Sequence, residues 1–225
     1  MTLKKHPKEH DLKLMIDNYW KNYKELFPEI NLNDFSNWAE EDMYGGWEES
    51  SHYNPAGRRE LKMLYVSIRF LKPKNILEIG THDGTSTNHI LLAAEQNQKE
   101  GYDSNITTLD IKDVVGSKKL HNFPHNRIIE SSLDHCKKYK NYDFIFQDGS
   151  HSFQNVTKEL ELFSNFDNLK FVLTHDYFLH GGQSVGSTGG VKMAIESFLS
   201  SNNLFKKRNL FKEASYNAGF HIGIR

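Results

Sequence analysis

The sequence predicts an open α/β fold, in which a mostly parallel, seven-stranded sheet carries helices on both faces. Between residues 75 and 174, short continuous apolar runs alternate with segments whose apolar residues recur every three or four positions. Continuous apolar strands are typical of parallel sheets that are buried on both sides. In addition, glycines and acidic residues directly follow these runs, which is where open α/β sheets bind ligands.

Each apolar run defines one expected strand, and each periodic segment defines one expected helix. The strands that we expect are Asn75–Gly80, Ile106–Asp110, Arg127–Glu130, Phe144–Gln147, Phe171–Thr174, Phe205–Phe211 and Phe220–Ile224. The helices that we expect between and after them are Thr85–Gln98, Leu133–Lys138, Phe153–Phe163 and Val191–Leu199. A glycine-rich stretch, residues 181–190, precedes the last of these helices and is expected to be a flexible loop.

The first part of the chain differs from the rest in the pattern of its apolar residues. We expect residues 1–72 to form a helical extension that caps the substrate, and residues 73–225 to form the core. Helical spacing of apolar residues is seen from His10 to Phe27 and from Pro55 to Leu71. Residues 29–54 look irregular. The stretch GGWEESSHYNPAGRR, residues 45–59, mixes aromatic and polar side chains that suit a sugar ring, a packing surface or a contact between copies in a homo-oligomer.

Composition limits the class of protein. The 225 residues are 37% hydrophobic, which is enough for a sizeable core. The net charge of -1 offers no basic excess for nucleic acid, so we expect a small-molecule partner. No apolar stretch approaches the roughly 20 residues of a membrane span, and the N-terminus lacks a signal-peptide core. A single cysteine, Cys136, excludes an internal disulfide and favours the cytoplasm.

The stretch NILEIGTHDGTST contains the turn that follows the first strand. Glu78 lies near the strand's end, and Gly80 and Gly84 flank the turn into the next helix. Glycines allow backbone amides to approach a ligand, and the start of a helix presents free N–H groups. A carboxylate placed before such a turn can engage an ammonium group, so we expect a cationic ligand here.

Two other ligand classes use similar turns. A dinucleotide fold requires G-x-G-x-x-G, whereas only Gly80 and Gly84 are present, and Asp83 between them would repel a pyrophosphate. A phosphate-binding P-loop is excluded because no Gly-Lys-Ser/Thr follows. An oxidoreductase that uses a nicotinamide dinucleotide is therefore the less favoured alternative.

The segment ILEIGTHDGTST resembles the first motif of class I S-adenosylmethionine-dependent methyltransferases, although His82 stands where a glycine is common. The resemblance implies the Rossmann-like fold of that family and S-adenosylmethionine as cofactor. The residues that it places against the cofactor are Glu78, Gly80, Thr81, His82, Gly84 and Ser86.

Two further positions are candidates for cofactor binding. Asp110 ends the second strand, 30 residues after Gly80, where an acid can accept both ribose hydroxyls. The same position serves nicotinamide cofactors, and a lone Asp is often a simple cap, so Asp110 does not discriminate by itself. Ser132 follows the third strand, and the resemblance places it near the adenine.

The ends of the next two strands carry a second group of polar residues. Asp148 and His151 follow the fourth strand, and His175 and Asp176 follow the fifth. Neighbouring strands lie about 4.8 Å apart, so the two carboxylates can share one divalent cation such as Mg²⁺. His151 is expected in the first turn of a helix, which favours the neutral imidazole that a general base needs. The alternative is that both acids are caps and His151 is solvated.

The pattern D-G-S-H followed by H-D-Y resembles a metal-dependent O-methyltransferase branch that includes enzymes acting on macrolide sugars and relatives annotated near cephalosporin hydroxylase. The resemblance implies that Asp148 and Asp176 hold the metal and that His151 is the base, with Asp148 also in the catalytic and cofactor sites. His175 stands where an acid or amide is common, and as a ligand it would favour softer ions.

The sequence therefore predicts an enzyme that methylates a hydroxyl of a small polar molecule, with a sugar or sugar-containing metabolite as the favoured acceptor. A divalent cation is expected to assist. The alternatives are the nicotinamide-dependent oxidoreductase and a methyltransferase-like module that binds the cofactor without turnover.

Overall fold

The computed structural model describes residues 24–25, 27–40, 55–115, 120–177, 190–203, 206–212 and 219–224. The strands in these ranges are β1 (Asn75–Ile79), β2 (Asn105–Asp110), β3 (Asn126–Ile129), β4 (Phe144–Gln147), β5 (Phe171–Thr174), β6 (Lys206–Lys212) and β7 (Gly219–Ile224). The helices are α2 (Leu32–Glu40), α3 (Pro55–Leu71), α4 (Thr85–Lys99), α5 (Ser132–Lys138), α6 (Phe153–Phe163) and α7 (Gly190–Ser201).

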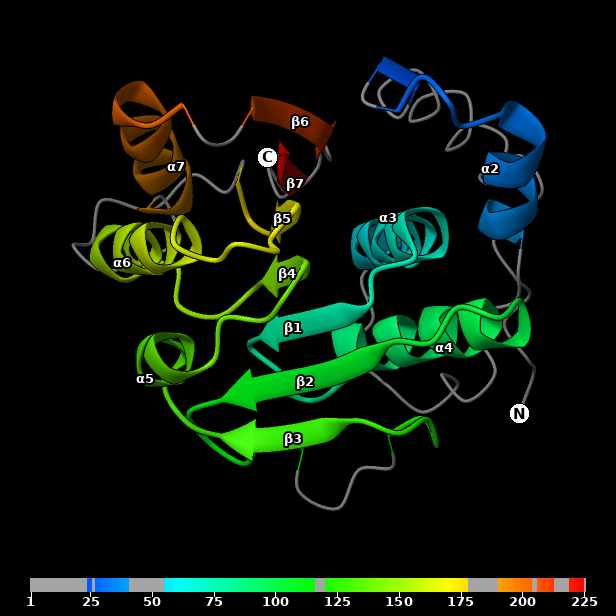
Figure 1. Cartoon of the computed structure of the whole chain (residues 1–225), viewed down its shortest axis with the longest axis horizontal. Helices are drawn as coiled ribbons and strands as arrows, with labels where there is room; N and C mark the ends of the chain where they lie inside the picture. Colours follow the sequence, from blue (N-terminus) through cyan, green and yellow to red (C-terminus); the bar gives the residue numbers. More distant parts are fainter. Residues whose placement is uncertain are drawn as a thin grey trace.

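The seven strands of the described ranges form one sheet in the order β3-β2-β1-β4-β5-β7-β6. The first five are parallel, and β7 is antiparallel to both β5 and β6. Figure 1 shows the arrowheads of β1, β2 and β3 at one edge of the sheet. The mostly parallel α/β fold expected from the sequence is confirmed, and the parallel strands bring their carboxyl ends together.

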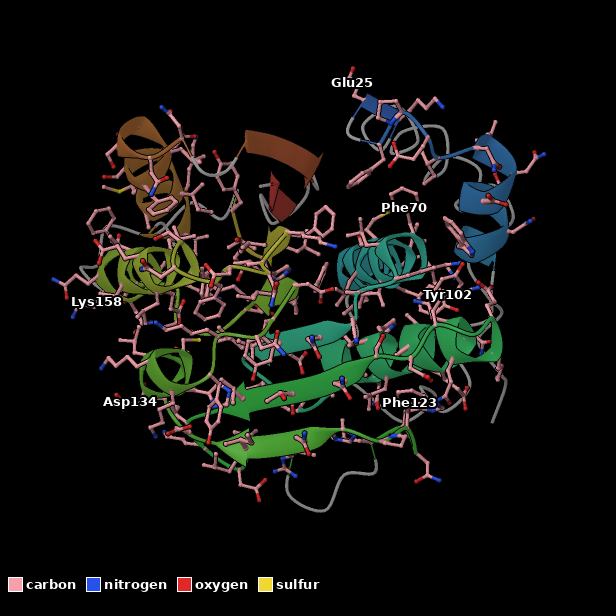
Figure 2. The ribbon with its side chains drawn as sticks, viewed as in Figure 1. Glu25, Phe70, Tyr102, Phe123, Asp134 and Lys158 are labelled. Carbon is pink, nitrogen blue, oxygen red and sulfur yellow. The ribbon has the colours of Figure 1, made fainter. Side chains whose placement is uncertain are left out.

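Helices cover both faces of the sheet, with α3 and α4 on one side and α5, α6 and α7 on the other (Figure 1). Successive strand residues point to opposite faces of the sheet and pack in two separate hydrophobic cores. Ile76 and Phe144 pack with α3 and α4, whereas Leu77 and Ile145 pack with α5, α6 and α7. On the outer surface of the second layer, Asp134 and Lys158 point away from the sheet (Figure 2). These strands are buried on both sides, which explains their continuous apolar runs.

Helix α3 belongs to the core layer rather than to a separate cap. Its residues Leu64 and Ile68 are fully buried in the same cluster as strand residues of the sheet. Arg69, only 2% exposed, donates to Asn97 and forms an ion pair with Glu100 at 2.6 Å, which ties α3 to α4. The expected division between residues 1–72 and residues 73–225 stays a prediction, and α3, at the end of the first part, packs in the same core as the sheet.

Helix α2 corrects the expectation that residues 29–54 are irregular. The side chain of Asn31 accepts a hydrogen bond from the backbone N–H of Asp34 at 2.8 Å, so it caps the helix. Trp38 then packs against Phe70, with ring centroids 6.0 Å apart. Residues 41–54 lie outside the described ranges.

The other expected elements agree with the structure to within one or two residues at their ends, as is usual for element boundaries. Most of the helix expected from His10 to Phe27 lies outside the described residues, as does the expected loop at 181–190, except that Gly190 begins α7. Within the described ranges, none of the helices combines the length and apolar character that crossing a bilayer requires.

Candidate functional site

The turn after β1 is held in a conformation that only a few residue types adopt. Gly80 and Gly84 have φ of 95° and 83°, and His82 between them has φ of 44°. A Cβ on Gly80 would lie 2.2 Å from the carbonyl oxygen of Asp148. Gly80 is therefore required both for the left-handed backbone and for the close approach of the β1 turn to the β4 turn. The turn after β1 and the polar residues after β4 therefore lie at the same edge of the sheet.

Backbone donors of this turn are used within the protein. The amides of Gly80 and Thr81 both donate to the carbonyl of Leu109, at 2.9 and 3.0 Å. The amide of His82 donates to Oδ2 of Asp110 at 2.7 Å. The turn is thus tied to the end of β2, which gives it a fixed shape before any ligand arrives.

Asp110 ends β2, as expected, and is half-buried. Its second oxygen, Oδ1, accepts from the amide of Lys112 at 3.0 Å. Each carboxylate oxygen can accept more than one hydrogen bond, so both retain capacity for a ligand hydroxyl. Ribose binding by Asp110 is compatible with this geometry and stays a prediction. His82 lies beside it with its side chain 77% exposed.

Glu78 lies behind the turn rather than facing a ligand. Its side chain is fully buried and accepts hydrogen bonds from Ser86 Oγ at 2.6 Å and Thr87 Oγ1 at 2.5 Å. Burial raises the pKa of Glu78 to about 7, although the two hydroxyls act to lower it. The direct contact with an ammonium group that the sequence suggested is not open in this structure. Glu78 and Ser86 instead join β1 to the first turn of α4.

The second polar group forms where β4 and β5 end side by side. Gln147 is paired with Thr174, so the residues that follow the two strands are adjacent. The amide of Asp148 donates to the carbonyl of Ile79 at 2.8 Å, which places it next to the end of β1. The adjacency of these strands, on which the expected cation site depended, is confirmed.

Four side chains converge there, which we call the β4–β5 cluster: Asp148, His151, His175 and Asp176. Nε2 of His151 lies 3.5 Å from Oδ1 of Asp148 and 3.4 Å from Oδ2 of Asp176. Nδ1 of His175 lies 2.9 Å from Oδ1 of Asp148 and 3.3 Å from Oδ1 of Asp176. Their side chains are 13% to 25% exposed, so the cluster borders on solvent.

The electrostatics of the cluster favour charged groups. Burial acts to raise the pKa of Asp148, but His175 and His151 outweigh it and hold that pKa at about 2. The pKa of His151 is raised, chiefly by its contact with Asp148 and further by Asp176, against the effect of burial. Helix α6 begins at Phe153 with Ser152 as its cap, so His151 precedes the helix. The neutral imidazole expected from a place in the first turn is therefore not favoured.

The cluster fits a divalent cation. Ligand atoms of Asp148, His151 and Asp176 all lie within 4.8 Å of one another. Nε2 of His151 is buried and makes no hydrogen bond among the described residues, and the two carboxylate oxygens that it faces lie 3.4 and 3.5 Å away. A cation shared with these oxygens would satisfy the nitrogen.

Glu159 is a residue of this region that the sequence analysis missed. It lies on α6, fully buried, and accepts hydrogen bonds from Ser132 Oγ at 2.5 Å, Asn155 Nδ2 at 2.8 Å and Gln147 Nε2 at 3.1 Å. Burial raises the pKa of Glu159 to about 7. It thereby links Ser132, expected near the adenine, to the residue that precedes Asp148.

A signal for Glu159 was present in the sequence. The apolar face of α6 is marked by Val156, Leu160 and Phe163, and Glu159 falls on the same face at helical spacing. A glutamate in such a position needs hydrogen-bonding partners, because an unpaired buried carboxylate is costly.

Comparisons with known proteins agree with this geometry. Residues 77–177 match the family model described as a methyltransferase domain. That range begins in β1 and ends directly after Asp176, so it contains both the glycine turn and the β4–β5 cluster. The search of curated proteins found no match.

Solved structures share the fold at low sequence identity. The O-methyltransferase from Bacillus cereus in complex with SAH is 16% identical, with 93% of this chain and 100% of that chain covered and a TM-score of 0.57. SAH-bound PaMTH1 from Podospora anserina is 13% identical, with coverage of 100% and 99% and a TM-score of 0.55. The O-methyltransferase TomG from Streptomyces achromogenes, in complex with SAM, is 13% identical, with coverage of 95% and 98% and a TM-score of 0.54.

The similarity to these structures establishes the fold, and the family match covers the segment that carries the glycine turn and the β4–β5 cluster. Residues 77–177 thus match a methyltransferase domain, and the chain shares the fold of the solved methyltransferases named above.

Proposed function

We propose that this enzyme transfers a methyl group from S-adenosylmethionine to a hydroxyl of a small polar molecule, with a sugar or sugar-containing metabolite as the acceptor class. The observation that carries the proposal is the contact between the two halves of the site. Gly80 packs against the backbone of Asp148, so a cofactor held by the turn lies beside the β4–β5 cluster.

The cofactor half is proposed to use the turn and the strand ends beside it. The residues proposed to surround the cofactor are Gly80, Thr81, His82, Gly84, Asp110, Ser132 and Asp148. Glu78 and Ser86 support the turn through their mutual hydrogen bond at 2.6 Å. Asp110 retains lone pairs for the two ribose hydroxyls, and Glu159 holds the hydroxyl of Ser132 at 2.5 Å.

The reaction needs a group that accepts charge and a proton. The acceptor oxygen forms a bond to the methyl carbon as the carbon–sulfur bond breaks, S-adenosylhomocysteine leaves, and the hydroxyl proton passes to a base, either His151 or the solvent that borders the cluster. When bound, a divalent cation such as Mg²⁺ would orient the acceptor oxygens and lower the pKa of the acceptor hydroxyl. Asp148 and Asp176 would hold such an ion near the cofactor through their negative charge.

Two observations support oxygen as the methyl acceptor. The structures from Bacillus cereus and Streptomyces achromogenes carry the name O-methyltransferase. In addition, the β4–β5 cluster is built from oxygen and imidazole ligands that can bind hydroxyl groups through a cation. A sugar is favoured because it offers adjacent hydroxyls, of which two can be oriented together.

The test is a methyl-transfer assay with S-adenosylmethionine and a panel of sugars, nucleotide sugars, catechols and amines. We expect S-adenosylhomocysteine to form together with a product whose mass rises by one methylene and whose new group is an O-methyl ether. Methylation of amines alone would contradict the proposal. Binding of the cofactor with no turnover on any hydroxyl compound would favour the module without turnover.

A further inference from the structure

We propose that the β4–β5 cluster is a transition-metal site in which Nε2 of His151 is a ligand together with Asp148 and Asp176. In this assignment His175 does not bind the ion but orients Asp148. The ion is a divalent first-row transition metal such as Co²⁺ or Zn²⁺, in preference to Mg²⁺. The location beside the cofactor rests on the proposed function, whereas the binding of the ion does not.

Distances within the cluster carry the first step. Nε2 of His151 lies 3.5 Å from Oδ1 of Asp148 and 3.4 Å from Oδ2 of Asp176. Two ligands about 2.1 Å from one ion lie roughly 3.4 Å apart at the tetrahedral angle. At the right angles of an octahedral Mg²⁺ site they lie only about 3.0 Å apart. The two distances from His151 are therefore closer to the spacing of a four-coordinate ion.

The two histidines differ in how their ring nitrogens are satisfied. Nδ1 of His175 already lies at hydrogen-bond distance, 2.9 Å, from Oδ1 of Asp148. Nε2 of His151 is buried between two carboxylates without a hydrogen-bond partner among the described residues. A ring nitrogen that donates to a ligand carboxylate orients that ligand. Nε2 of His151, which makes no such hydrogen bond, is open to bind an ion shared with the two carboxylates.

The types of ligand atom in the cluster are the third argument for a transition metal. Mg²⁺ prefers oxygen ligands and retains several waters, whereas imidazole nitrogen suits Zn²⁺, Cu²⁺, iron and nickel. One imidazole with two carboxylates therefore favours the transition ions. The fourth position is left for an acceptor oxygen or water, as in sites that keep an open position.

This assignment changes the roles that the sequence suggested for the two histidines, which were the base for His151 and a metal ligand for His175. A lone pair on Nε2 of His151 that binds an ion cannot also accept a proton. His151 is then a binding residue rather than the general base, and His175 becomes a positioning residue.

The test is a titration of the full chain, freed of metal, with Co²⁺, followed by visible absorption and calorimetry. We expect the intense visible bands of four-coordinate Co²⁺, displacement of Co²⁺ by Zn²⁺, and no displacement by equal Mg²⁺. His151→Ala should weaken Co²⁺ binding more than 100-fold, whereas His175→Ala should weaken it about tenfold, as for orienting residues. His125→Ala, outside the cluster, is the matched control and should leave binding unchanged.

Several results would overturn the inference. These are Co²⁺ affinity retained in His151→Ala, a stronger loss in His175→Ala than in His151→Ala, or Mg²⁺ binding as tight as Co²⁺ binding. Circular dichroism of each variant separates lost binding from lost folding, and a misfolded alanine variant is replaced by His151→Gln. Wild type that binds Co²⁺ but not S-adenosylhomocysteine would support the inference while contradicting the proposed function.

Discussion

The carboxylates at the edge of this sheet are satisfied in two different ways. Near β1 and β2, Glu78 accepts from two hydroxyls and Asp110 from two backbone amides. Near β4 and β5, Asp148 and Asp176 face imidazoles, and one of those imidazole nitrogens has no hydrogen-bond partner among the described residues. In the first half the carboxylates shape a turn through these hydrogen bonds. In the second half they face an imidazole nitrogen that a further group, such as a cation, can satisfy, and we therefore place the chemistry there.

The largest effect is expected where the two halves touch. Gly80→Ala should lower the free energy of unfolding by about 4 kcal/mol, because the new Cβ combines a left-handed backbone with a 2.2 Å clash against Asp148. Urea unfolding measures the change. Gly101 also has positive φ, at 90°, but a Cβ there meets nothing within 4 Å.

The matched control is therefore Gly101→Ala, which should lose only the conformational part, about 1 to 2 kcal/mol. Equal losses in the two variants would contradict a tight contact between the β1 turn and the β4 turn.

Asp148→Ala should separate the two halves functionally. We expect methyl transfer to fall at least about 100-fold, because the cluster loses a charged group that lies beside the cofactor turn. The affinity for S-adenosylhomocysteine should fall by less, about tenfold or under, because Asp148 is only one of the residues proposed around the cofactor and the turn itself is tied to β2. Kinetics and calorimetry on one preparation give both values. An unchanged rate would remove Asp148 from the reaction.

Glu78 gives a pH dependence of stability. The pKa of about 7 in the folded state lies above the ordinary value of 4.5, so the folded state binds the proton more tightly. The stabilisation is present below pH 4.5 and is lost as pH rises through 7. Between pH 5 and 7.5 this contribution falls by about 2 kcal/mol, and Glu78→Gln should remove that fall.

Chemical unfolding of wild type and variant at the two pH values measures the difference. If both proteins showed the same pH dependence, Glu78 would not have a raised pKa in the folded state. That result would contradict the burial of its carboxyl group behind the turn.

The smallest effect is expected for Asp110→Asn. Asn can still accept the hydrogen bond from the amide of His82 through its one carbonyl oxygen, so the turn keeps its shape. Loss of the charge and of one acceptor should weaken S-adenosylhomocysteine binding about tenfold, or about 1.4 kcal/mol. Calorimetry checks this, with adenine alone as a control ligand whose affinity should not change.

The sequence was sufficient for the sheet, because buried parallel strands have continuous apolar runs and end in glycine or acid. It was not sufficient for α2, in which a short helix depends on the capping side chain of Asn31 and on the contact of Trp38 with Phe70. The contact of Trp38 with Phe70 joins residues far apart in the sequence, so local spacing does not reveal it.

The candidate site was predictable in its members and less so in their roles. The ends of neighbouring strands placed Asp148 and Asp176 together, as the structure confirms. The side of the sheet on which Glu78 lies could be predicted, because side chains alternate along β1. Glu78 lies on the same side as Ile76, which packs with α3 and α4. The difference between His151 and His175 depends on ring placement and on where α6 begins, which spacing does not determine.

The most direct test of the account is calorimetric titration of the full chain with S-adenosylhomocysteine, with NAD as the comparison ligand. The account predicts saturable one-to-one binding of S-adenosylhomocysteine and no binding of NAD, because the turn lacks the third glycine and carries Asp83. Binding of NAD in its place would contradict the assignment of the turn, and with it the proposal that the β4–β5 cluster serves methyl transfer.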